Sequence, residues 1–239
     1  MLRKYVLKLI FLQLFLLFET SIAQQINLDD NTFFFPHAYR TGQIIHSLGL
    51  STAKLPEDVI ETDDAFRAPL FTYKLKCGLP ENFLLEGGLE TNIITFHFAL
   101  GPKWNYVVDR WGFSVGGDIV YWFGQLDQFG FDTKFYGWIL YPNLSAGFRF
   151  NKYTITLKSE AVLNLAETSK NGGLEISDDL DFYNGWTIGV YLEQPLWKDN
   201  FVVIGIRSTF LKFYYPMWAA FSAFDRTFFI PEATFRFIL

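Results

Sequence analysis

The sequence predicts an all-β protein, an antiparallel up-and-down transmembrane β-barrel of about ten strands, within a range of roughly eight to twelve. Three observations predict it. Apolar and polar residues alternate in runs that turn residues interrupt, aromatic residues make up 20% of the chain, and no window after the N-terminal apolar segment is long and apolar enough for a spanning helix. Because no sheet edge can face hydrocarbon, a lipid-exposed protein without such helices has to close its sheet into a barrel.

The composition limits the other classes of protein. Hydrophobic residues are 50% of the chain, with 28 Phe, 12 Tyr and 7 Trp. The one cysteine, Cys77, excludes an intramolecular disulfide. The formal net charge of −5 provides no basic surface, so we expect no nucleic-acid partner. The sequence carries no metal-binding motif and no glycine-rich phosphate loop, so we expect no metal and no cofactor.

The N-terminal stretch MLRKYVLKLIFLQLFLLFETSIAQQ predicts a secretory signal peptide over residues 1–23. Basic residues precede the apolar run Leu9–Phe18, and Ser21 and Ala23 supply the small residues of a cleavage site. A retained anchor is the alternative, but the run is about half of the roughly 20 residues that a spanning helix needs. Residues 24–40, which include NTFFFPHAYR, form a lead segment that we expect to plug the barrel's periplasmic mouth or to add a strand.

Four strands are predicted in the first half of residues 41–239, the barrel domain. Thr41–Ala53 has the weakest pattern of the set. Ala65–Cys77 alternates aromatic or aliphatic residues with threonine and lysine, and Phe83–Glu90 alternates them with glutamate. Ile93–Trp104 opposes threonine, histidine and lysine to phenylalanine and leucine. Since strand side chains alternate between two faces, each segment has one polar and one apolar face.

The second half of the barrel domain has the clearer alternation. Trp111–Gly124 and Phe135–Phe150 each set small, hydroxyl and charged residues against aromatic and aliphatic ones. Tyr153–Glu167, with the sequence YTITLKSEAVLNLAE, does the same, and so do Asn184–Trp197 and Phe201–Tyr215. A closing strand that ends on the last residue completes the count.

The connections alternate in length, as they do in outer-membrane barrels. Short turns are expected at Pro80–Asn82, Asn151–Lys152 and Lys198–Asn200, and longer polar loops at Leu55–Asp64, Gln125–Lys134, Thr168–Tyr183 and Tyr215–Asp225. Two connections depart from this rule. Thr91–Asn92 is short on the outer side, and Pro102–Arg110 is long for a periplasmic turn.

The closing strand TFFIPEATFRFIL alternates to the last residue of the sequence. A chain that stops on such a strand resembles small bacterial outer-membrane β-barrel proteins, a general class without a specific motif. The resemblance implies that the last strand closes the barrel and is read by the barrel-assembly machinery, and it implies export to the outer membrane of a diderm bacterium. Leu239 stands where these proteins usually have an aromatic residue.

The orientation of the two faces decides between a membrane barrel and a soluble lipocalin-like binder. Aromatic residues near strand ends favour the membrane, because they suit a girdle at the lipid interface; they are Tyr136, Trp138, Trp186, Trp197, Tyr214 and Tyr215. We therefore predict that the polar face lines the lumen. The charged or titratable residues expected there are Lys74, Lys76, Glu86, Glu90, His97, Lys103, Asp118, Arg149, Lys158, Glu160, Glu193, Arg207, Glu232 and Arg236.

This lumen predicts a non-enzymatic protein. Charges of both signs in a narrow interior should pair into a plug, or else line a narrow passage for a small solute. We expect a structural or surface-binding barrel in contact with outer-membrane lipid, whose small-molecule ligand the sequence does not define. The alternative is a hydrolase or acyltransferase at the outer rim. Of His37, His46 and His97, only His97 is a catalytic candidate, with Glu86 or Glu90 as its partner.

Overall fold

The computed structural model describes residues 31–56, 67–128, 131–171, 174–176, 181–196, 200–220 and 226–239. The predicted signal peptide, the start of the lead segment, most of the loop Leu55–Asp64 and Trp197 lie outside these ranges.

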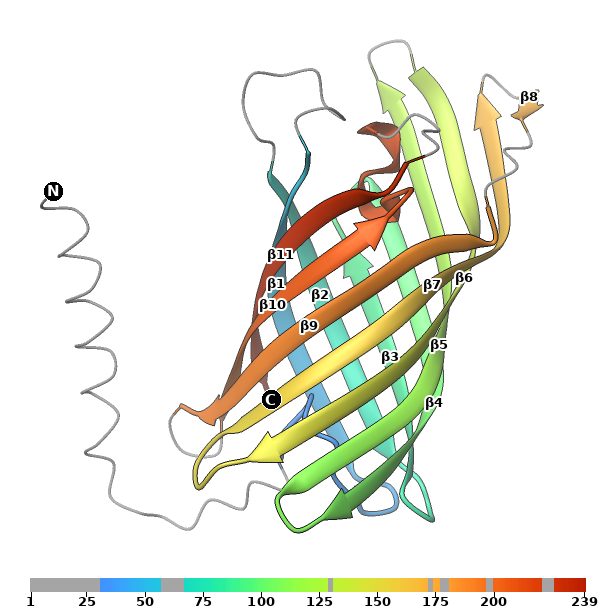
Figure 1. Ribbon diagram of the computed structural model, residues 1–239. Helices are drawn as coiled ribbons and strands as arrows, with labels where there is room; N and C mark the ends of the chain where they lie inside the picture. The colour runs from blue at the N-terminus through green and yellow to red at the C-terminus, as the bar shows by residue number, and fades with distance from the viewer. Residues whose placement is uncertain are drawn as a thin grey trace, which may run out of the picture.

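The described residues form strands and one short 3₁₀ helix (Figure 1). In chain order the elements are β1 (Ile44–Lys54), β2 (Arg67–Gly78), β3 (Phe83–Thr91), β4 (Thr95–Val108), β5 (Trp111–Gln128), β6 (Phe131–Arg149), β7 (Thr154–Asn171), β8 (Leu174–Ile176), β9 (Tyr183–Pro195), β10 (Phe201–Leu211), the 3₁₀ helix η1 (Tyr215–Ala220) and β11 (Phe228–Ile238). No helix among the described residues is long and apolar enough to cross a membrane.

All of the strands except β8 close into one antiparallel barrel, which confirms the predicted fold class and the predicted ten strands. Strands that follow one another in the chain are neighbours, and β7 pairs with β9. The barrel closes where β11 pairs with β1, with Ser47 opposite Ile238. The short β8 pairs only with the last residues of β7. The sheet thus has no unpaired edge along the barrel wall.

The two ends of the barrel carry different connections. At the turn end, the lower end in Figure 1, tight hairpins join β2 to β3, β4 to β5, β6 to β7 and β9 to β10. The lead segment and the last residue lie at this end as well. At the loop end are the other connections, including η1.

Two predicted connections were wrong, Gln125–Lys134 and Pro102–Arg110, and so was the girdle prediction for Tyr214 and Tyr215. Gln125–Lys134 is largely paired strand, since Gln125 lies opposite Lys134. Here β5 and β6 extend beyond the apolar core of the barrel, and their polar residues resemble those of a loop. Similarly, β4 continues to Val108, and Asp109–Arg110 alone turns the chain, with Asp109 at φ 52°. This is the left-handed conformation that tight hairpins need.

The predicted strand Phe201–Tyr215 also ends earlier than expected. β10 stops at Leu211, and Tyr214 and Tyr215 leave the wall and are buried inside the barrel at the start of η1. They therefore take no part in the predicted aromatic girdle. Trp138 and Trp186 do face outward, at 45% and 41% exposure.

The wall is apolar outside and polar inside. In β7, Leu157 is 45% exposed and the neighbouring Thr156 is fully buried. The same alternation runs round the barrel, where leucine, isoleucine, phenylalanine and tryptophan side chains dominate the outward positions. A lipocalin-like soluble barrel has the opposite arrangement. An outward apolar surface of this extent requires a hydrocarbon environment.

Candidate functional site in the barrel interior

Every residue predicted to line the lumen lies on the inward side of the wall, where most of them are buried. The largest group joins β2, β3, β4 and β5. Glu86 forms ion pairs with Lys103, at a nitrogen–oxygen distance of 2.5 Å, and with Lys76, at 3.4 Å. Lys103 also contacts Asp118 at 3.3 Å, and the Asn143 amide donates to the same carboxylate at 3.0 Å. The group therefore alternates positive and negative charges across four adjacent strands.

Further ion pairs continue this pattern round the interior. The nitrogen–oxygen distances are 3.1 Å for Lys74–Glu90, 2.7 Å for Lys158–Glu160 and 2.6 Å for Arg207–Glu232. In a narrow, poorly hydrated space an unpaired charge is costly, whereas a paired and hydrogen-bonded one is tolerated. The arrangement is thus a ring of neutralised charges at mid-height of the barrel.

The lead segment fills the turn end of the interior. Glu193 of β9 is fully buried, and its carboxylate accepts hydrogen bonds from three successive backbone N–H groups. The distances are 2.6 Å from Phe33, 3.0 Å from Phe34 and 2.6 Å from Phe35. The Thr154 hydroxyl donates to the same carboxylate at 3.3 Å. One acidic side chain of the wall therefore holds one turn of the lead segment.

The lead segment's carbonyls and rings are bound as well. Lys76 donates to the carbonyl of Phe33 at 2.5 Å, and Asn105 donates to the carbonyl of His37 at 2.7 Å. The ring of Phe34 stacks on Tyr191 with centroids 3.9 Å apart. We call residues Phe33–Tyr39 the turn-end plug, because their chain lies at the mouth between the strands (Figure 1) and most of their side chains are buried.

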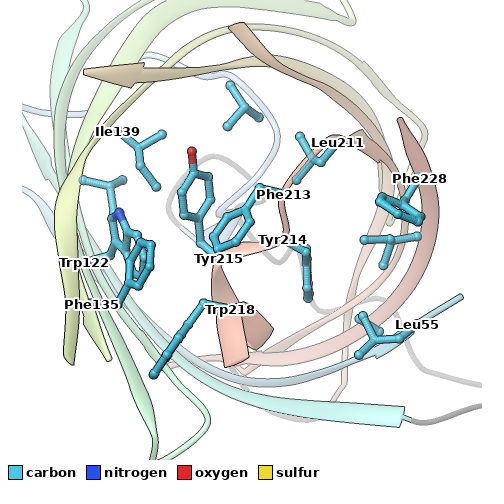
Figure 2. Packing of buried hydrophobic residues seen from close by; sticks show 14 residues of the cluster. Leu55, Trp122, Phe135, Ile139, Leu211, Phe213, Tyr214, Tyr215, Trp218 and Phe228 are labelled. Atoms are coloured by element: carbon cyan, nitrogen blue, oxygen red, sulfur yellow. The ribbon is translucent and has the colours of Figure 1, made fainter. Parts of the chain in front are cut away.

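The chain also fills the loop end, but with apolar side chains. Figure 2 shows Phe213, Tyr214, Tyr215 and Trp218 pointing into the barrel from the segment around η1, toward Trp122 and its neighbours on the wall. Trp218 stacks on Phe135 of β6 with ring centroids 5.6 Å apart. Burial raises the pKa of Tyr214 and of Tyr215, so both phenols stay protonated.

Three side chains hold the main chain of this loop-end plug, Phe213–Trp218. The amide of Asn92 donates to the carbonyl of Pro216 at 2.5 Å, and the Thr95 hydroxyl contacts the same carbonyl at 3.3 Å. Asn184 pairs with both the N–H and the carbonyl of Phe213 at 2.8 Å. Gly124 provides room, since a Cβ there would lie 2.0 Å from the indole nitrogen of Trp218.

A cavity of about 70 Å³ lies between the two plugs. It is lined by the charged side chains of Lys74, Glu90, Asp118, Glu160 and Arg207, and it is bounded toward the loop end by residues of the loop-end plug. The volume suits a few water molecules or a small polar solute, because a single buried water needs roughly 10–15 Å³. Its mixed charge favours neither cations nor anions.

His97 also lines this cavity. It lies opposite Glu90 in the register of β3 and β4, as its suggested pairing requires, and it is 7% exposed. Within the described residues its Nε2 has no hydrogen-bond partner. No group of three or more histidine, cysteine, aspartate or glutamate side chains in the described part of the chain could hold a metal ion.

Sequence reasoning missed the loop-end plug and the role of Glu193. The signal for the plug was present in FYYPMW, where Pro216 interrupts a strand pattern that is aromatic on both faces. No signal in the sequence distinguishes Glu193 from the other acidic residues of the polar face. Its role depends on which part of the chain enters the barrel beside it.

No protein-family model and no curated protein matches the sequence. Solved bacterial structures are similar to it. Neisserial surface protein A is 11% identical over 82% of this chain and 96% of its own, with a TM-score of 0.39. The translocator domain of the autotransporter NalP from Neisseria meningitidis is 13% identical over 82% and 86%, with a TM-score of 0.41. CdiB from Acinetobacter baumannii is 12% identical over 70% of this chain, which spans only 31% of that protein, with a TM-score of 0.34.

These proteins resemble the chain in fold alone. The placement of the barrel in a membrane rests on its own outward apolar surface.

Proposed function

We propose that the protein is a non-enzymatic barrel of the outer membrane of a diderm bacterium, closed at rest, with a structural or surface-binding role. One observation carries the proposal: the chain's own residues fill both ends of an interior in which most of the charged side chains are paired. A closed and neutralised interior is suited to holding the wall together and is unsuited to steady conduction.

The topology supports a defined orientation. Outer-membrane barrels have short periplasmic turns and longer outer loops. The turn end is therefore the periplasmic end in this proposal, and the turn-end plug and the C-terminal end of the closing strand β11 both lie there. This position leaves the closing strand accessible to the barrel-assembly machinery. The loop end, with η1, would face the outside.

Single-channel recording of the refolded full-length protein in a planar bilayer tests the proposal. Insertion is first verified by the shift in gel mobility between heated and unheated samples. The proposal predicts an inserted protein without regular openings. Discrete and reproducible openings of the wild-type protein would contradict it.

A gated passage for a small polar solute is a second candidate, and the cavity between the plugs favours it. It would require both plugs to move. A Glu193→Gln, Trp218→Ala double variant weakens both, since it removes one anchor from each. Openings in this variant alone would favour the gated passage, and silence in both proteins would favour the structural role.

The burial of His97 between the two plugs gives the rim-sited hydrolase or acyltransferase no support. A lipid substrate could not contact this side chain unless the loop-end plug were displaced. Assay of the wild-type protein and of His97→Ala against phospholipid vesicles tests this alternative. Activity that is lost in the variant would restore it.

A further inference from the structure

The carboxylate of Glu193 contacts the lead segment through the main chain only. Three successive N–H groups of the segment converge on this one anion. In other proteins such concave groups of N–H donors bind the carboxylate or phosphate of a ligand. Here the anion belongs to the barrel wall, and the N–H groups belong to the bound segment. Hydrogen bonds to an ionised acceptor are about twice as strong as neutral ones. This contact does not depend on the side chains of Phe33, Phe34 and Phe35.

The acceptors of the same segment are satisfied by the wall. Lys76 and Asn105, on β2 and β4, donate to the carbonyls of Phe33 and His37. Donors and acceptors of a bent stretch are thus paired at both of its ends by side chains from different strands. This pattern recognises the main chain of the peptide in a bent conformation.

The aromatic rings of the segment pack against cationic side chains and a glycine of the wall. Lys76 lies over the ring of Phe33 at 4.7 Å, and Arg149 lies over the ring of Phe35 at 4.7 Å. A Cβ at Gly147 would come within 2.6 Å of the Phe35 ring, so the wall is left bare where that ring packs. The side chains therefore add a preference for aromatic residues to the recognition of the main chain.

The wall does not need this segment for its own hydrogen bonds. Each of the ten barrel strands pairs with a neighbour on both sides, and in the described residues the segment Phe33–Tyr39 contributes no strand. Its departure would break the contacts above, would uncover the rings of Phe33 and Tyr39 where they pack on the wall, and would let water reach Glu193. The segment is thus a bound peptide that happens to be covalently attached.

We propose that the turn end of the barrel interior is a binding site for a peptide with consecutive aromatic residues, whose main chain bends round the carboxylate of Glu193. Phe33–His37 occupies it in cis, and a peptide of the same kind binds in trans when that segment is displaced. Specificity arises from Glu193, Lys76 and Asn105 for the main chain, and from Tyr191 and Arg149 for the rings.

The test uses the full chain with Phe33→Lys and Phe35→Lys, because a cation at each position would lie against Lys76 or Arg149, and the repulsion should displace the attached segment and leave the wall unchanged. The probe is a fluorescent peptide with the sequence of residues 31–40, and binding is measured by anisotropy in detergent. We expect saturable binding to this double variant and at least about tenfold weaker binding to the wild-type protein, whose own segment competes.

Two controls make the result specific. Adding Glu193→Gln to the double variant should weaken peptide binding by about tenfold or more, whereas adding Glu160→Gln, a buried acid that pairs with Lys158, should not change it. A probe with lysine at the two phenylalanine positions should not bind, because its cations would face Lys76 and Arg149. Equal binding to the wild type and the double variant, or binding that is indifferent to Glu193→Gln, would overturn the proposal.

A second measurement serves if the double variant does not fold. Hydrogen exchange of the amides of residues 33–35 and 37 is followed in Asn105→Ala, which removes one main-chain contact and no charge. Faster exchange of these amides, without faster exchange in the barrel strands, supports the site. Unchanged exchange would contradict it.

Discussion

The barrel is closed at its two ends by different physical means. At the turn end, a segment that precedes the first strand is held by main-chain hydrogen bonds to a carboxylate, a lysine and an amide, and by the burial of its own rings. At the loop end, a segment tethered between β10 and β11 is held mainly by aromatic packing. The first plug is joined to the barrel wall at one end of the segment only and can leave by breaking its polar contacts and uncovering its rings, whereas the second is joined to the wall at both of its ends.

This difference shows how a closed barrel can be firm at one end and releasable at the other. Apolar burial contributes to the stability of the whole fold, because it is lost on unfolding. Polar contacts to a detachable segment contribute mainly to local closure, since water replaces them when the segment leaves. The predictions below test this division, from the largest expected effect to the smallest.

Trp218→Ala should have the largest effect. The indole is buried among rings of the loop-end plug and the wall, and its loss should lower the free energy of unfolding by about 3–5 kcal/mol. Denaturant titration in lipid vesicles measures this. Exchange of the amides of residues 33–35 should stay as in the wild type. A loss of less than about 1 kcal/mol would show that the loop-end plug is not part of the cooperative fold.

Leu100→Arg tests the wall that both plugs require. Leu100 is in β4 opposite Gly87 and Ile119, is 52% exposed, and faces outward at mid-height. A charge at that depth should cost about 2–4 kcal/mol. Ile93→Arg is the matched control, because Ile93 lies in the β3–β4 connection and is 78% exposed. Equal refolding yields in vesicles for the two variants would show that this face does not meet hydrocarbon.

A pair of glycine variants compares the two plugs directly. A Cβ at Gly124 would clash with Trp218, and one at Gly147 would clash with Phe35. Gly124→Ala should lower the free energy of unfolding by about 1–3 kcal/mol, because the packed loop-end plug has to shift. Gly147→Ala should cost less, since the turn-end plug can leave. The reverse order in a denaturant titration would contradict the division between the two ends.

Glu193→Gln should have the smallest effect on global stability and the largest on local closure. The amide offers one acceptor oxygen and brings donors toward N–H groups, so the turn-end plug should detach. Because detachment limits the loss, the free energy of unfolding should fall by about 1 kcal/mol. Chemical unfolding and amide exchange of residues 33–35 are measured together. A large global loss with unchanged local exchange would refute this account.

The wall could be predicted from the sequence because strand alternation is a local property. Thr156 and Leu157 in β7 show their opposite faces in any window of a few residues. The polar face of Gln125–Lys134 was misinterpreted as a loop because paired strands that extend past the core carry the same polar residues as loops do. Where a strand ends is set by its partner, and a single sequence does not show the partner.

The plugs could be predicted only in part. The aromatic cluster of NTFFFPHAYR suggested a plug, but its contact with Glu193 joins residues about 160 positions apart and depends on barrel closure. The loop-end plug was not predicted because Tyr214 and Tyr215 continue the alternating pattern of β10 beyond its last residue, Leu211. Alternation indicates which face a side chain takes on a strand, and it carries no information on where the chain leaves the wall.

Hydrogen exchange of the wild-type protein in detergent, followed at both plugs in a single experiment, tests the difference between the two ends most directly. Amides of residues 33–35 should exchange through local opening, at a rate that low denaturant concentrations do not change. Amides of the loop-end plug should exchange only with the barrel strands. Equal exchange at both plugs, each tied to global unfolding, would contradict the account.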